Sequence, residues 1–82
     1  MPYYVYVLKS TNFNRRYIGS CEDLHLRLQQ HNSGKVRSSK AYKPYELAYS
    51  EIFQTRSEAF KREQFFKTLE GYNFLKSINI YR

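Results

Sequence analysis

Residues 3–8 read Tyr-Tyr-Val-Tyr-Val-Leu, a run of aromatic, β-branched and aliphatic residues with no charged side chain. A strand with one buried face alternates apolar and polar residues, whereas a strand covered on both faces is apolar throughout. We therefore expect this segment to lie in the middle of a sheet. A second strand pattern at residues 15–19 follows a short polar loop with two Asn residues, so the two strands are predicted to form a hairpin.

The first helix is predicted to follow this hairpin directly. Residues 20–23 place the hydroxyl of a Ser three positions before an Asp, a pattern typical of a helix start. Leu24, Leu28 and His31 then recur at helical spacing. The Asn-Ser-Gly sequence at residues 32–34 is a common stop signal.

The second half of the chain predicts one more strand and two more helices. The strand pattern returns at residues 45–53, and a second helix-start pattern stands at residues 55–58. This helix is expected to run to about Glu70, with Gly71 ending it. Residues 72–78 predict a short last helix, whose buried side chains should be those of Phe74, Leu75 and Ile78.

The predicted element order is strand, strand, helix, strand, helix, helix. This order indicates an α+β fold with a three-stranded antiparallel sheet flanked by helices. Because a chain of 82 residues has room for one hydrophobic core, residues 1–82 are expected to form a single domain.

The composition favours a polyanionic partner. Lys and Arg number 14 against seven acidic residues, which gives a formal net charge of +7. So large a positive charge on a small domain favours binding to nucleic acid, although positive charge can also simply increase solubility. The single Cys21 excludes an internal disulfide and a Cys-rich zinc module. With no signal peptide pattern and no long apolar run, we expect a cytoplasmic protein without membrane contact.

Three polar residues lie at helix positions that the fold alone does not explain. Arg27 and His31 share a helix side that borders the predicted buried face of Leu24 and Leu28. An ordinary surface Arg with its stem on the core edge, and a His capping the helix end, explain them equally well. Glu63 stands on the stripe of Ala59 and Phe66, where a carboxylate needs a cation or several donors.

Glu63 also has an alternative interpretation, which is an i,i+4 pair with Lys67 at the edge of the stripe. Tyr6 and Tyr17 lie on neighbouring strands of the hairpin, and by themselves they are best interpreted as core aromatics. Gly19 ends the second strand, where a glycine either turns the chain or allows close approach of a ligand to the backbone.

A basic loop is predicted at residues 35–44, which hold no acidic residue. The segment is too polar for the core, so we expect it on the surface. Its cationic and aromatic side chains are candidates for sequence-independent contacts to a nucleic-acid backbone. They are Lys35, Arg37, Lys40, Tyr42 and Lys43.

Together these residues resemble the GIY-YIG nuclease superfamily. The tripeptides at residues 4–6 and 17–19 (Tyr-Val-Tyr and Tyr-Ile-Gly) resemble the two that name it, although Tyr and Val replace the first Gly and Ile. Arg27 follows ten positions after Tyr17, as the catalytic Arg of the superfamily does, and His31 comes one turn later. Glu63 matches the metal-binding Glu of the later helix. The resemblance covers nearly the whole chain and is greatest for small stand-alone bacterial members.

The resemblance implies a metal-dependent endonuclease with nucleic acid, and DNA above all, as its partner. One Mg²⁺ or Mn²⁺ would be held by Glu63, and the guanidinium of Arg27 would bind phosphate oxygens. Tyr6 would take a proton from the attacking water, with its pKa lowered by Arg27 and the metal. His31 would accept that proton or hold the Tyr6 hydroxyl, and Tyr17 would contact the phosphate or orient the water.

Two other functions stay open at this point. A catalytically inactive nucleic-acid-binding module could keep the same scaffold and charge. A protein-interaction domain could use the aromatic residues, and it would then be insensitive to salt and Mg²⁺. The presence of both Arg27 and Glu63 favours the nuclease over the inactive module, which would be expected to lose one of them.

Overall fold

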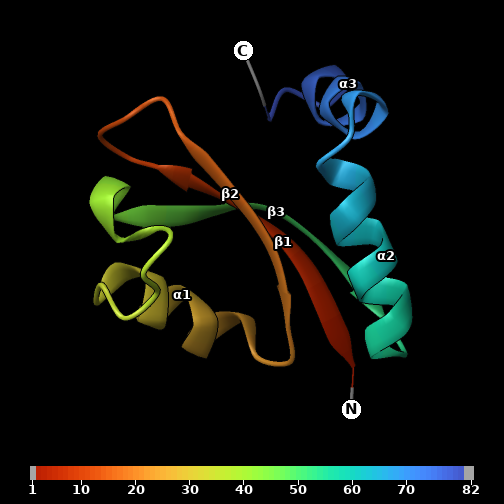
Figure 1. The fold of residues 1–82 in the computed structure, drawn as a ribbon, viewed down its shortest axis with the longest axis horizontal. Coiled ribbons are helices and arrows are strands. Elements are labelled where there is room, and N and C mark those ends of the chain that lie inside the picture. The colour runs from red at the N-terminus through yellow and green to blue at the C-terminus, as the bar shows by residue number, and fades with distance from the viewer. Residues whose placement is uncertain (1, 81–82) are drawn as a thin grey trace.

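The structure is a computed structural model that describes residues 2–80. Its elements are β1 (Tyr3–Ser10), β2 (Arg16–Cys21), α1 (Leu24–Asn32), the short 3₁₀ helix η1 (Lys40–Tyr42), β3 (Tyr45–Phe53), α2 (Arg56–Phe66) and α3 (Leu69–Ser77). The predicted α+β order of strand, strand, helix, strand, helix, helix is confirmed (Figure 1). Within the described range, no helix is long and apolar enough to cross a bilayer.

The three strands form one antiparallel sheet in the order β2-β1-β3. The expectation that residues 3–8 form the central strand is therefore confirmed. The hairpin register pairs Tyr6 with Gly19 and Leu8 with Tyr17. Since β2 pairs only with β1 within the described sheet, it is an edge strand. The predicted site residues lie on both sides of this strand.

The helices lie on opposite faces of the sheet, with α1 on one face and both α2 and α3 on the other (Figure 1). Val5 and Val7 point to the α2 side, where they pack with Phe66 and Leu75. Tyr6, on the same strand, points to the α1 side. This arrangement explains why β1 is apolar on both faces.

The first helix begins later than its sequence pattern predicted. Asp23 is the N-cap, and its carboxylate accepts a hydrogen bond from the Leu26 amide at 3.0 Å. Ser20, the predicted start signal, instead belongs to β2. An Asp side chain caps as well as a Ser does, and strand pairing of Ser20 with Val5 decides between the two positions.

The second helix ends earlier than expected, at Phe66. A new helix starts after Thr68, whose hydroxyl accepts from the Gly71 amide at 3.1 Å. Gly71 is therefore a buried residue inside α3 and does not end α2. A Cβ at this position would clash with the backbone carbonyl of Phe65, so Gly is needed where α3 turns away from α2. Ile78, predicted as core, is 38% exposed.

The loop between α1 and β3 is more ordered than its polarity suggested. It starts with Gly34 at a φ of 82°, a left-handed conformation that favours glycine. It then forms the 3₁₀ turn η1. Ser39, directly before this turn, is only 1% exposed, so the expectation of a purely surface loop is wrong at this residue. The Tyr45 hydroxyl donates to the Ser39 carbonyl at 2.8 Å and holds the loop against the sheet.

Candidate functional site

The hairpin places the two tyrosines of the tripeptides on the α1 face of the sheet. The rings of Tyr6 and Tyr17 are stacked, with centroids 6.3 Å apart and planes inclined by 24°. Tyr6 is 1% exposed, whereas Tyr17 is half-buried and its hydroxyl lies 3.5 Å from the exposed Ser38 hydroxyl. Of the two phenols, Tyr17 is therefore the one with access to solvent.

Gly19 is explained by Tyr6 and not by a turn. The two residues face each other in the hairpin register, and the Tyr6 ring lies over the Gly19 backbone. A Cβ on Gly19 would come within 2.5 Å of the Tyr6 hydroxyl oxygen. The close approach expected at this glycine is real, but the approaching group is a side chain of the protein.

Helix α1 carries Arg27 to the same place. Its Nε donates a hydrogen bond to the Tyr6 hydroxyl oxygen at 3.3 Å, and its Nη1 donates to Gln30 Oε1 at 3.1 Å. The hydrogen bond that Arg27 donates to Tyr6 raises the pKa of Arg27 further above its usual range, although partial burial opposes this. The guanidinium is thus a fixed cation, and Nη2 has no hydrogen-bond partner among residues 2–80.

His31 lies at the centre of this cluster and is fully buried. Its Nε2 is 3.0 Å from the Tyr6 hydroxyl oxygen and its Nδ1 is 2.6 Å from Ser39 Oγ. Its ring centroid is 4.5 Å from that of Tyr17. The alternative in which His31 caps the helix end is wrong, because Ser33 is the C-cap and the imidazole faces the sheet.

Burial governs the ionisation of both groups. Desolvation raises the pKa of Tyr6 to about 12, although the hydrogen bond and charge of Arg27 act in the opposite direction. Desolvation, followed by the charge of Arg27, lowers the pKa of His31 to about 4. Arg27 therefore acts on the pKa of Tyr6 in the expected direction, but burial outweighs its effect. At neutral pH, Tyr6 is a phenol and His31 is uncharged.

Glu63 lies on the other side of the sheet. Ser20 Oγ donates to Glu63 Oε1 at 2.7 Å, and Lys67 Nζ is 2.8 Å from Glu63 Oε2. The alternative of an i,i+4 pair with Lys67 is thus confirmed as a contact. Because side chains alternate along β2, Ser20 faces α2 while Tyr17 faces α1. The structure brings Tyr6, Tyr17, Arg27 and His31 together, and it places Glu63 beyond the edge strand from them.

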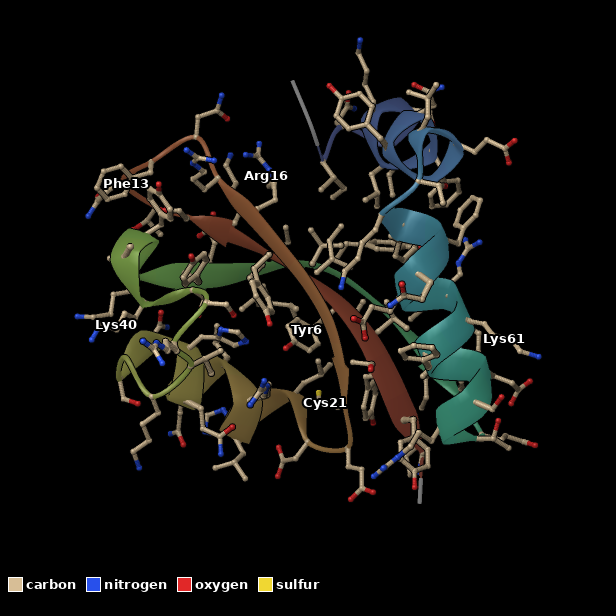
Figure 2. All side chains as sticks on the ribbon, viewed as in Figure 1. Tyr6, Phe13, Arg16, Cys21, Lys40 and Lys61 are labelled. Carbon is tan, nitrogen blue, oxygen red and sulfur yellow. The ribbon has the colours of Figure 1, made fainter. Side chains whose placement is uncertain are left out.

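Two separate hollows lie near the end of β2, and Glu63 is not among the residues that line them. One, of about 310 Å³, is lined by Ser20 and Ala59 on the α2 side. The other, of about 250 Å³, is lined by Arg27 and Gln30 on the α1 side. Cys21 and Glu22, at the end of β2, are part of the lining of both hollows. Figure 2 shows Cys21 at this end of the strand, near Tyr6.

Glu63 is the residue of the predicted site that could hold a divalent ion, as a single carboxylate ligand. No cluster of three or more His, Cys, Asp or Glu side chains exists within residues 2–80, so a fully protein-ligated site is not formed there. Mg²⁺ commonly takes one or two carboxylates and retains several waters. The side chain of Glu63 is 14% exposed, and the Lys67 ammonium already marks a cation position beside its Oε2.

The basic loop lies beside the tyrosines, on the α1 side of the molecule. Lys40 and Phe13 lie on this side, whereas Lys61 lies on the opposite side with α2 (Figure 2). Tyr42 packs its ring 5.3 Å from that of Phe13, and Arg15 lies 4.6 Å above the Tyr42 ring. The remaining predicted contact residues of this loop are all exposed, namely Lys35, Arg37, Lys40 and Lys43.

Three residues that hydrogen-bond to candidate site residues were not predicted from the sequence. They are Ser20, Gln30 and Ser39. Gln30 follows Arg27 by three positions, a spacing at which helix side chains meet, so it could have been found from the helix pattern. Ser20 and Ser39 have no comparable signal, because their partners are 43 and 8 residues away.

Several proteins are similar to this chain. The UPF0213 protein SSP2268 of Staphylococcus saprophyticus is 36% identical over 78 residues, which cover 94% of each chain. The UPF0213 protein YazA of Bacillus subtilis is 40% identical over 68 residues, covering 82% of this chain and 68% of YazA. A solution NMR structure of the UPF0213 protein BH0048 from Bacillus halodurans matches with a TM-score of 0.56 and 27% identity. It covers 96% of this chain and 86% of its own.

Residues 2–76 match the family profile of the GIY-YIG catalytic domain. This match spans both tripeptides, the Arg27 and His31 cluster and Glu63. It confirms the resemblance drawn from the sequence motifs. The chain belongs to the GIY-YIG family.

Proposed function

We propose that this protein is a metal-dependent endonuclease that hydrolyses phosphodiester bonds of nucleic acid, with DNA as its main substrate. The observation that supports this best is the fixed guanidinium of Arg27, held at Nε by Tyr6 and at Nη1 by Gln30. Arg27 also lines a hollow at the end of β2. A cation held in one orientation with donors left over suits the non-bridging oxygens of a phosphate.

Glu63 is the proposed ligand for one Mg²⁺ or Mn²⁺ ion. When bound, such an ion polarises the phosphoryl oxygen and lowers the pKa of a coordinated water. Ser20 holds one carboxylate oxygen in place, at 2.7 Å. Lys67 is 48% exposed and can swing away from the other oxygen, which leaves it free for the ion. Glu63 and Arg27 lie on opposite sides of the edge strand β2, so the proposed ion site and the guanidinium would act on the substrate from two sides of this strand.

The two tyrosines take different roles in this proposal. Tyr6, a phenol under neutral conditions, holds the Nε edge of Arg27 through its hydroxyl oxygen. Tyr17 has solvent access and is placed to hydrogen-bond the phosphate or to orient the attacking water. His31 supports Tyr6 from the buried side. A phenol with a raised pKa is a poor proton acceptor at neutral pH, so Tyr6 would orient Arg27 and the proton of the attacking water would leave to solvent.

The basic loop would hold the nucleic-acid backbone next to this cluster. Its four exposed cations and the Tyr42 ring are on the Arg27 side of the sheet. Contacts of this kind position the substrate without reading its sequence. The free thiol of Cys21 suits a reducing compartment, so we place the protein and its substrate in the cytoplasm.

The proposal is tested with Glu63→Gln, which keeps the size of the side chain and its hydrogen bond to Ser20. We expect loss of Mg²⁺-dependent cleavage of plasmid DNA, with unfolding by heat largely unchanged. Glu70→Gln, an exposed carboxylate in the first turn of α3, is the matched control and should cut normally. Cleavage by Glu63→Gln at the wild-type rate would refute the metal assignment.

A catalytically inactive nucleic-acid-binding module is the second candidate. It is favoured by one observation: both oxygens of Glu63 already have partners, in Ser20 and Lys67. In that case a gel shift would show salt-sensitive DNA binding, while neither Mg²⁺ nor Mn²⁺ would produce cleavage. Wild-type protein assayed for both binding and cutting separates the two candidates directly.

A further inference from the structure

A continuous chain of hydrogen bonds runs from Arg27 to the loop before η1. Arg27 Nε is 3.3 Å from the Tyr6 hydroxyl oxygen, which is 3.0 Å from His31 Nε2. His31 Nδ1 is 2.6 Å from Ser39 Oγ, which is 3.3 Å from the Val36 carbonyl oxygen. Tyr6, His31 and Ser39 are each no more than 1% exposed, so water cannot complete missing bonds in the middle of the chain.

The two end groups of this series of hydrogen bonds determine which group donates and which accepts at each step. Arg27 can only donate, and the Val36 carbonyl can only accept. A neutral imidazole has one donor and one acceptor nitrogen, and each hydroxyl has a single proton. Every group is satisfied if Tyr6 donates to His31 Nε2, His31 Nδ1 donates to Ser39, and Ser39 donates to Val36. His31 is uncharged at neutral pH, as this arrangement requires.

The opposite tautomer leaves a buried proton without an acceptor. If His31 carried its proton on Nε2, the Tyr6 oxygen would accept from both His31 and Arg27. The Tyr6 proton would then have no partner, since the described residues offer its hydroxyl no third contact. An unsatisfied buried hydroxyl is costly, and native structures avoid it. Every buried side-chain nitrogen and oxygen within residues 2–80 has a partner here.

We infer that Ser39 is a positioning residue, which holds His31 in its Nδ1–H tautomer and thereby directs the Tyr6 hydroxyl proton away from Arg27. The lone pair of the Tyr6 oxygen is then free to accept from Arg27 Nε. The hydrogen-bond partner of one ring nitrogen commonly selects the tautomer of a histidine in this way. The significance of this arrangement for cleavage rests on the proposed function, whereas the tautomer itself does not.

The consequence is that the orientation of the guanidinium depends on a residue of the basic loop. With Nε fixed by Tyr6 and Nη1 by Gln30, the outer edge with Nη2 is the part of Arg27 that remains for a phosphate. If Ser39 could not accept, His31 could adopt either tautomer. The Tyr6 hydroxyl proton would then have no fixed acceptor, so the hydroxyl that anchors Arg27 Nε would lose its single orientation.

The tautomer can be measured without any substrate. The ¹⁵N resonances of the two ring nitrogens differ strongly between protonated and unprotonated states, so a long-range ¹H–¹⁵N spectrum of wild-type protein at pH 7 assigns the proton. His25→Gln removes the only other histidine and identifies the His31 signals. We expect Nδ1–H as the dominant state. A spectrum with the proton on Nε2 would overturn the inference.

Ser39→Ala gives the second measurement. We expect the His31 signals to shift to a mixture of tautomers or to Nε2–H, and cleavage to fall about tenfold, with kcat affected more than KM. Ser77→Ala is the matched control, because Ser77 also donates to a carbonyl three residues earlier but lies in α3, away from His31. An unchanged His31 tautomer in folded Ser39→Ala contradicts the inference.

The two proposals fail in different ways. If wild-type protein shows the Nδ1–H tautomer but no cleavage with Mg²⁺ or Mn²⁺, the proposed nuclease function is wrong while the role of Ser39 holds. If cleavage is present and the tautomer is Nε2–H, the nuclease function holds and the role of Ser39 is wrong. The wild-type spectrum gives this answer even if Ser39→Ala does not fold.

Discussion

The hydroxyl of Tyr6 lies directly over the backbone of Gly19, so close that a Cβ on Gly19 would come within 2.5 Å of it. The two residues face each other across β1 and β2. The last residue of the second tripeptide is therefore small because the last residue of the first is large. The contact between Tyr6 and Gly19 thus explains why one tripeptide ends in a large residue and the other in a glycine.

Gly19→Ala is expected to displace the Tyr6 ring and to break its hydrogen bonds to His31 and Arg27. Overpacking of this kind costs about 1–3 kcal/mol of unfolding free energy, which urea titration will measure. In a Tyr6→Phe background, one of the clashing atoms is absent, so Gly19→Ala should cost less there. Equal costs in both backgrounds would show that the clash with the hydroxyl is unimportant.

Arg27→Lys keeps the positive charge but loses the planar set of donors. Lysine cannot donate to Tyr6, to Gln30 and to a phosphate from fixed directions. We expect kcat/KM for DNA cleavage to fall by about 100-fold, the effect of removing one well-placed donor to a developing charge. The melting temperature of the variant serves as the control for folding. Activity within a few fold of wild type would contradict the role given to the guanidinium.

Acidification should destabilise the fold through His31. Its pKa is about 4 in the folded protein and 6.5 in an ordinary environment. Between these values the unfolded chain binds a proton and the folded protein does not, so stability falls as the pH drops below 6.5. From pH 7 to pH 5 the loss from this group is about 2 kcal/mol. Urea titrations at both pH values measure it.

His31→Asn should remove most of this pH dependence, even though the variant is less stable throughout. His25→Gln should retain it, because His25 is an exposed residue on the outer side of α1. If the two variants show the same pH dependence, His31 is not the group responsible.

Nucleic-acid binding should depend on where the positive charges lie. The double variants Lys35→Gln/Lys40→Gln and Lys61→Gln/Lys76→Gln each remove two exposed charges, but the first pair is in the basic loop and the second is on α2 and α3. Only the first should lower the slope of log affinity against log salt, by about 2 units. Fluorescence anisotropy at several salt concentrations measures both. An equal effect of both variants would indicate binding by net charge alone.

The fold was predictable because its strongest signals are local. Residues 3–8 could only be a doubly covered strand, and the strand at residues 45–53 has the bounds that its pattern indicated. Errors arose where two signals competed. Gly71 resembles a helix stop, but Thr68 provides an N-cap three residues earlier, and the chain uses the cap. The purpose of Gly71, contact with the Phe65 backbone, is not visible without the tertiary structure.

The candidate site was predictable in its members but not in its ionisation. Helical spacing placed Arg27 and His31 on one side of α1, and the hairpin placed Tyr6 beside Tyr17. The sequence does not show, however, how deeply each of these side chains is buried. Burial raises the pKa of Tyr6 by more than the nearby Arg27 lowers it, so the pKa rises although proximity to a cation alone suggested a fall. Ser39 was assigned to a polar surface loop, because its burial depends on contacts with His31 and Tyr45.

The central strand has a consequence for how this protein can vary. Successive residues of β1 serve opposite faces, so Val5 and Val7 fill the interior under α2 while Tyr6 supports Arg27 on the other side. Insertion or deletion of a single residue before Tyr6 would exchange the two sets and put the phenol among Phe66 and Leu75. Sequence changes on the interior face of β1 and on the face that carries Tyr6 are therefore subject to the same constraint on register. Variants of this chain must therefore keep the number of residues along β1.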